Sequence, residues 1–214
     1  MTASLFMRSS IAAGVPAGAT RAVGYVPDDE PRGYRAVLGD SMVVIRGKDG
    51  KVHLSQQHNP ISNEAERQAM IARGAAFRQL LNSAGQRVPY MIVTVGGEDF
   101  AIRISRGLGA GRFASALSRE PEIDSVELGE GSFIVMGSDG LFGPPSREAI
   151  EARVAYLAGL VEEGADAQAL VDAALAQDGS DNVTTILWRA PRQPIADGTP
   201  SAEPPMPPAV PKDE

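Results

Sequence analysis

Short apolar segments of strand length make up most of this chain, and helical periodicity appears only in separate blocks between them. The strand-like segments cover residues 35–38, 42–45, 52–54, 90–95, 100–105, 123–128, 133–136 and 183–188. Helical spacing of apolar residues is confined to residues 63–73 and to two segments that begin at Ser146 and Asp166. Strands with helices inserted in blocks predict an α+β fold rather than a repeating βαβ unit.

The clearest boundary in the chain lies near Ala190. Proline, alanine and acidic residues dominate from there to Glu214, and such a segment buries too little apolar area to offset its ordering entropy. The sequence therefore predicts a folded domain over residues 1–189 and a disordered, proline-rich tail over residues 190–214. A binding motif in the tail is the open alternative, since proline-rich segments dock on aromatic grooves, but a spacer is favoured.

Composition excludes several classes of function. The 214 residues carry a formal net charge of −7 and no basic stripe, so nucleic acid is not an expected partner. No apolar run approaches 18 residues, which predicts no membrane span. The absence of cysteine excludes disulfides and thiolate chemistry and is compatible with a reducing cytosol, so we predict a cytoplasmic protein.

Three aspartates occupy similar positions at the ends of apolar segments. Asp139 follows residues 133–136 closely, Asp181 precedes residues 183–187, and Asp40 lies between two apolar runs. Carboxylates that converge from strand ends are the ligands that Mg²⁺ or Mn²⁺ prefers. The alternative is structural, because Asp139-Gly140 taken alone is a common turn dipeptide. The combination of three such sites with small neighbours favours a metal site.

Other kinds of site find less support in the sequence. A zinc site is not expected, because cysteine is absent and His53 and His58 have no third ligand. No G-x-S-x-G nucleophile elbow and no phosphate loop of the G-x-x-x-x-G-K-[ST] type occur. The glycines of residues 107–111 would suit a dinucleotide fingerprint, but Arg112 stands where its third glycine is needed.

The order and spacing of the motifs resemble one known family. Its elements here are Gly18-Ala19-Thr20, Gly39-Asp40-Ser41, His58-Asn59-Pro60, Ser105-Arg106-Gly107-Leu108-Gly109, Ser138-Asp139-Gly140-Leu141-Phe142 and Ser180-Asp181-Asn182-Val183. This succession is similar to the PPM-type metal-dependent protein serine/threonine phosphatases, the protein phosphatase 2C group. The resemblance covers most of the chain outside the tail.

The resemblance implies a fold, a cofactor and a reaction. The fold is two antiparallel β-sheets packed face to face with helices on both outer sides, an α-β-β-α sandwich, with a two-metal site at one edge. Asp139 would contact both metals and Asp181 would ligate one of them, while Asp40 would help to form a looser third metal site. Gly140, which follows Asp139, is assigned to the same metal site. The cofactor would be Mn²⁺ or Mg²⁺. The reaction would be hydrolysis of phosphoserine or phosphothreonine in a phosphorylated protein substrate by a metal-activated water.

This sequence also departs from the family pattern. Its first strands, a phosphate-gripping arginine and an Asp-Gly-His-Gly-type turn do not appear, so the chain is expected to begin inside the domain, and no catalytic residue is assigned. Milder changes are Gln57, Ala110 and Gly143 at positions where acidic residues are common. The alternative function is therefore a catalytically impaired remnant that binds phosphoproteins or partners. A sheet edge exposed by missing strands predicts self-association, which light scattering would detect.

Overall fold

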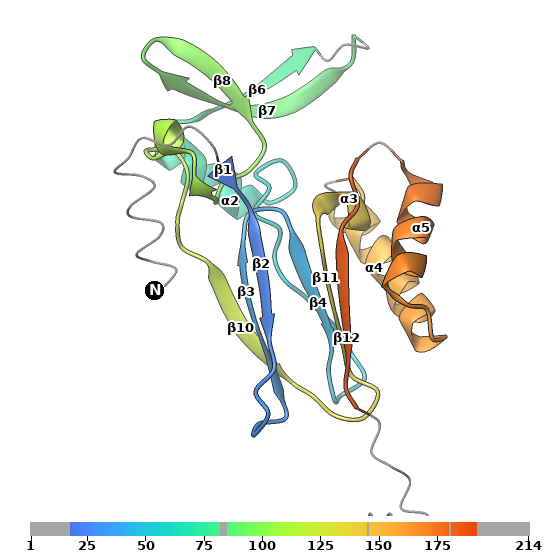
Figure 1. Ribbon diagram of the computed structural model, residues 1–214. Coiled ribbons are helices and arrows are strands. Elements are labelled where there is room, and N and C mark those ends of the chain that lie inside the picture. The colour runs from blue at the N-terminus through green and yellow to red at the C-terminus, as the bar shows by residue number, and fades with distance from the viewer. Residues whose placement is uncertain (1–17, 82–84, 145, 180, 192–214) are drawn as a thin grey trace, which may run out of the picture.

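The computed structural model describes residues 18–81, 85–144, 146–179 and 181–191, and two antiparallel sheets packed face to face form its centre (Figure 1). One sheet has the strand order β10-β3-β2 and the other β12-β11-β4-β5. Their strands are β2 (Arg21–Tyr25), β3 (Arg32–Leu38), β4 (Met42–Arg46), β5 (Val52–Leu54), β10 (Glu122–Glu127), β11 (Phe133–Gly137) and β12 (Thr185–Arg189). The predicted α+β fold with two packed sheets is confirmed.

Alternation along the strands creates two apolar layers. Val43 and Ile45 of β4 face the other sheet and pack with Val37 and Ile134 between the two sheets. Met42 and Val44, on the opposite face of β4, belong to the core beneath the helices. Successive side chains of a strand point to opposite faces, so one short apolar strand contributes to both layers. Full burial of each such side chain stabilises the fold by about 1.5–3 kcal/mol.

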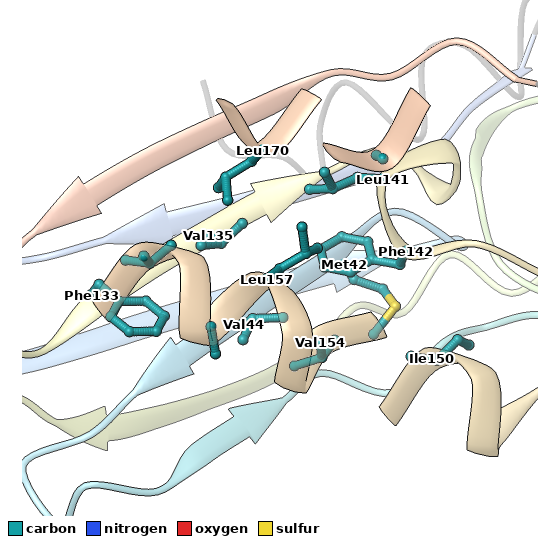
Figure 2. Close-up of a cluster of buried hydrophobic side chains, with 13 residues drawn as sticks. Met42, Val44, Phe133, Val135, Leu141, Phe142, Ile150, Val154, Leu157 and Leu170 are labelled. Carbon is teal, nitrogen blue, oxygen red and sulfur yellow. The ribbon is translucent and has the colours of Figure 1, made fainter. Parts of the chain in front are cut away.

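Three helices cover the outer face of the four-stranded sheet: α3 (Asp139–Phe142), α4 (Arg147–Glu162) and α5 (Ala167–Gln177) (Figure 1). Figure 2 shows the core that they close, where side chains of β4, β11 and the helices meet. The predicted caps are confirmed, because the Ser146 hydroxyl accepts from the Ala149 amide and the Asp166 carboxylate from the Ala169 amide. Leu141 and Phe142 are fully buried and fix α3 on the sheet.

A smaller sheet of order β6-β7-β8 lies at one end of the molecule beside helix α2 (Figure 1). Its strands are β6 (Ala76–Leu81), β7 (Arg87–Val95) and β8 (Glu98–Ile102), and α2 spans Glu64–Ala72. Met70 of α2 and Met91 of β7 are completely buried, with 0% exposure, in a third apolar cluster. The chain then forms β9 (Leu108–Gly109), which pairs with β1 (Gly18–Ala19), and a 3-10 turn, η1 (Gly111–Phe113).

The structure adds elements that the sequence pattern did not predict. Strands β2 and β6 were not expected, because their sequences, Arg-Ala-Val-Gly-Tyr and Ala-Phe-Arg-Gln-Leu-Leu, lack a clear apolar alternation. Residues 139–142 form the short helix α3 instead of a turn, because burial of Leu141 and Phe142 stabilises four residues that have little helical preference of their own. The predicted tail lies outside the described residues, apart from Ala190 and Pro191.

Two further expectations from the sequence concern self-association through a free strand edge and membrane spans. Within the described residues, β2 hydrogen-bonds only to β3 and β12 only to β11, and Tyr25 and Ile186 on these strands are more than half exposed. Self-association through such an edge stays a prediction. The described part of the chain contains no helix whose length and apolar character would allow it to cross a membrane.

Candidate functional site

Strand register brings the three aspartates to the same end of the four-stranded sheet. Gly137, the last residue of β11, is paired with Met42, the first residue of β4, and with Thr185, the first residue of β12. Asp40 precedes Met42 by two residues and Asp139 follows Gly137 by two. Asp181 precedes Thr185 by four residues, so all three carboxylates gather at this sheet end.

The turn that carries Asp40 is fixed by hydrogen bonds on both sides. The Gly39 amide donates to Nδ1 of the buried His58 at 3.1 Å, and the His58 amide donates to the Gly39 carbonyl at 3.0 Å. Gly39 has a φ of 109°, and a Cβ there would lie 2.3 Å from the Thr20 side chain. Glycine is required by both facts, because other residues rarely adopt this φ and no space exists for a side chain.

Ser138 joins the segments that carry Asp139 and Asp181. Its hydroxyl donates to the Asn182 carbonyl at 3.1 Å and accepts from the Thr184 amide at 3.1 Å, and its own amide donates to the Thr184 carbonyl. Because one side chain bridges both segments, the two aspartates are held in a fixed relation to each other.

One pocket of about 300 Å³ is lined by all four residues that the sequence analysis assigned to the metal site: Asp40, Asp139, Gly140 and Asp181. The described residues around it are Asp40, Gln57, Asn59, Arg103, Asp139, Gly140, Gly143, Pro144, Asp178 and Asp181. A larger hollow of about 610 Å³ lies between α2, β5 and α4, and Gln57 lines both. The smaller pocket is the functional candidate, because four aspartate carboxylates line it and, among the described residues, none lines the larger one.

The electrostatics of the pocket act most strongly on Asp40. Burial, together with the negative charge of Asp139 and a smaller contribution from Asp181, raises the pKa of Asp40 to about 6. Arg103 acts in the opposite direction. A carboxyl whose ionised form is disfavoured by burial and by like charges indicates a site that lacks sufficient positive charge of its own.

The donor set of the pocket suits a hard divalent cation. Carboxylates and the amide oxygens of Asn59 and Gln57 are oxygen ligands of the kind that Mg²⁺ and Mn²⁺ select. In the part of the chain that the structure describes, no three His, Cys, Asp or Glu side chains lie close enough to hold a metal ion directly. The fit to Mg²⁺ or Mn²⁺ therefore rests on the chemical type of the donors that line the pocket.

Gly140 contributes space rather than a side chain. A Cβ on Gly140 would lie 2.5 Å from the Asn182 carbonyl oxygen, a backbone atom that cannot move away cheaply. We expect Gly140→Ala to destabilise the protein by about 2 kcal/mol in urea unfolding, as overpacking does. The matched control is Gly159→Ala in helix α4, where a Cβ meets nothing within 4 Å and the change should stabilise by about 0.5–1 kcal/mol. Equal effects of the two variants would contradict the close packing of α3 against residues 181–184.

Comparison with known proteins decides the family. The family model for protein phosphatase 2C matches residues 5–183, which is most of the chain. The chain belongs to the protein phosphatase 2C family. This confirms the resemblance inferred from the motif order, and the members of this family are metal-dependent phosphatases.

Relatives of known name or structure agree with this membership. A "Probable protein phosphatase 2C 11" of Arabidopsis thaliana is 29% identical over 174 residues, which cover 81% of this chain and 42% of the relative. The crystal structure of a serine-threonine phosphatase 2C from Toxoplasma gondii matches with a TM-score of 0.62 and 20% identity, over 86% of this chain and 62% of that one.

A C. elegans sex determining protein matches with a TM-score of 0.56 and 18% identity, over 85% of this chain and 42% of that one. At these identities the structural matches support the fold alone. The chain spans about two fifths of the length of the curated relative that it matches.

The element Ser105-Arg106-Gly107-Leu108-Gly109 belongs to a partly buried polar network. Glu66 accepts from the Ser105 hydroxyl at 2.5 Å and forms an ion pair with Arg106 at 2.5 Å. Burial raises the pKa of Glu66, but the hydrogen bonds from Arg106 and Ser105 outweigh it and hold the pKa below its ordinary value. The Ser105 amide also donates to the His58 carbonyl, so the network supports the loop that contacts Gly39.

Two of the sequence departures affect the neighbourhood of the site differently. Gly143 lines the pocket, so the change from an acidic residue removes a negative charge there. Ala110 is buried away from the pocket lining and adopts a left-handed conformation, with a φ of 47°. That backbone conformation costs a residue other than glycine about 1–2 kcal/mol.

Sequence reasoning missed four side chains of the pocket: Gln57, Asn59, Arg103 and Asp178. Arg103 was missed because residues 100–105 were predicted to form one strand. In the structure β8 ends at Ile102, and Arg103, the next residue, lines the pocket. Asp178 ends helix α5, and its place three residues before Asp181 was the available signal. The signal for Gln57 was its place where the family commonly has an acidic residue, and the signal for Asn59 was its place in the His58-Asn59-Pro60 element.

Proposed function

We propose that this chain hydrolyses phosphoserine or phosphothreonine in proteins with the help of Mn²⁺ or Mg²⁺. The observation that carries the proposal is the gathering of Asp40, Asp139 and Asp181 around one pocket in a chain of the protein phosphatase 2C family. Carboxylates alone would repel a phosphate group, so this donor set is useful for phosphoester chemistry only with a cation.

The residues of the pocket have distinct tasks in this proposal. Asp139, in the first turn of α3, and Asp181, before β12, would hold the cation from two segments that Ser138 joins. Asp40 would add negative charge beside the cation from a turn fixed by His58. A bound divalent cation supplies a nucleophilic water near neutral pH and offsets negative charge on the transferred phosphoryl group. Asn59 and Gln57 complete the polar lining.

The experiment is hydrolysis of a phosphothreonine peptide by the 214-residue chain, with Mn²⁺ and with excess EDTA. We expect turnover in Mn²⁺ and its loss in EDTA. Thermal unfolding measured in parallel should show a higher Tm with Mn²⁺, because a ligand that binds only the folded state stabilises it. Turnover that EDTA does not affect would exclude the proposed chemistry.

The alternative is a module that binds phosphoproteins or other partners without turnover. A folded chain that gains stability from Mn²⁺ and binds the phosphothreonine peptide, but releases no phosphate over hours, would favour it. The gathering of Asp40, Asp139 and Asp181 around one pocket supports catalysis over this alternative, so hydrolysis is the proposed function.

A further inference from the structure

The described residues that line the aspartate pocket carry one positive charge against four negative ones. The carboxylates belong to Asp40, Asp139, Asp178 and Asp181, and the cation is Arg103. Divalent cations bound to the carboxylates would offset most of this negative charge. Arg103 would then be the protein's own positive group facing the space where a phosphate must lie.

Most buried or half-buried arginines of the described chain are committed to structural contacts. Arg35 binds Asp124 and three backbone carbonyls, Arg106 binds Glu66, and Arg119 binds the Gly109 carbonyl at 2.7 Å. Within the described residues, Arg103 forms no ion pair within 4 Å, and its guanidinium lies 5.9 Å from the centre of the Tyr90 ring. Its charge is therefore available to a ligand.

The backbone beside Arg103 is fixed although its side chain is exposed. Arg103 directly follows β8, whose last residue, Ile102, pairs with Met91 of β7. Two residues later, the Ser105 amide and hydroxyl both donate to the His58 carbonyl, at 2.9 and 3.0 Å. The guanidinium therefore projects from an anchored segment, and the ordering cost of using it is limited to its side chain.

We propose that Arg103 binds the phosphate of the substrate at the mouth of this pocket, an inference that rests on the proposed phosphatase function. A guanidinium offers two parallel N–H donors that match two phosphate oxygens, which a single ammonium cannot do. The ligand class is a phosphomonoester dianion.

The test compares Arg103→Ala and Arg103→Lys with the control Arg78→Ala, an exposed arginine of β6 whose nearest carboxylate oxygen, of Asp99, is 3.9 Å away. For Arg103→Ala we expect the KM for a phosphothreonine peptide and the Kd for inorganic phosphate on the Mn²⁺-loaded chain to rise about 10-fold. The Kd for Mn²⁺ should stay equal or fall, because a repelling charge is removed. Arg103→Lys should lie between, and Arg78→Ala should match the wild type.

Two outcomes would overturn the inference: phosphate affinity unchanged in Arg103→Ala, or affinities for Mn²⁺ and phosphate that fall together, which indicates only a structural role. The phosphate titration separates this inference from the proposed function. A chain without turnover whose phosphate affinity still depends on Arg103 would support the inference and refute the function. Turnover with a KM that Arg103→Ala does not change would do the reverse.

Discussion

Asp139→Asn should abolish Mn²⁺-dependent hydrolysis of a phosphothreonine peptide, with a loss on the order of 100-fold or more in kcat/KM, about 2.7 kcal/mol of transition-state stabilisation. The substitution keeps the size of the side chain and removes its charge. Asp139 lies in the first turn of α3, beside the fully buried Leu141, and its Oδ1 accepts from the Gly140 amide at 3.1 Å. An amide at this fixed position is a much weaker ligand for a hard cation.

The control for Asp139→Asn is Asp172→Asn. Asp172 is an acidic residue of α5 outside the pocket, and its carboxylate accepts from the Gln168 side chain. We expect wild-type turnover in this control and unchanged far-ultraviolet circular dichroism in both variants. Mn²⁺ titration by calorimetry should show weaker binding for Asp139→Asn alone. Wild-type activity in a folded Asp139→Asn variant would exclude Asp139 from the metal site.

Asp40→Asn should stabilise the metal-free protein at pH 7–8 by up to about 3 kcal/mol. Burial and the charge of Asp139 raise the pKa of Asp40 to about 6 from an ordinary value of 3.8. A raised pKa means that the folded state binds the proton more tightly than the unfolded state does. Each pKa unit corresponds to about 1.36 kcal/mol, so ionised Asp40 costs roughly this amount in the folded state.

The pH dependence of this effect has a defined sign. Between about pH 4 and pH 6 the folded state holds more protons on Asp40 than the unfolded state, so the cost appears as pH rises through this window. Above pH 6 the cost is complete, and below pH 4 both states are protonated. The advantage of Asp40→Asn should therefore be full at pH 7–8 and vanish near pH 4.

Urea unfolding in EDTA at pH 4, 6 and 8 measures the free energy of unfolding that this prediction concerns. Repetition in excess Mn²⁺ should reduce the advantage of Asp40→Asn, because the cation then favours the ionised carboxylate. The Asp172→Asn variant serves again as the control and should show no such pH window. A constant difference between wild type and Asp40→Asn from pH 4 to pH 8 would refute the raised pKa of Asp40.

The amino-acid sequence by itself determined the fold class and three carboxylates of the site. Asp40, Asp139 and Asp181 were found because each lies at the end of a short apolar segment, and the boundary between strand and turn is a local property of the chain. The caps Ser146 and Asp166 were found for the same reason, since a helix start depends on residues within one turn. These features need no knowledge of distant neighbours.

Only the tertiary structure decided which groups share the pocket and what charge they carry. Arg103 enters it because β8 ends at Ile102. The pKa of Asp40 rises because its carboxyl is buried and because Asp139, 99 positions further along the chain, faces it across paired strands. Helix α3 forms because the sheet and the helices bury Leu141 and Phe142. Burial and like-charge repulsion depend on atoms brought together from distant parts of the chain, and no local pattern of residues specifies them.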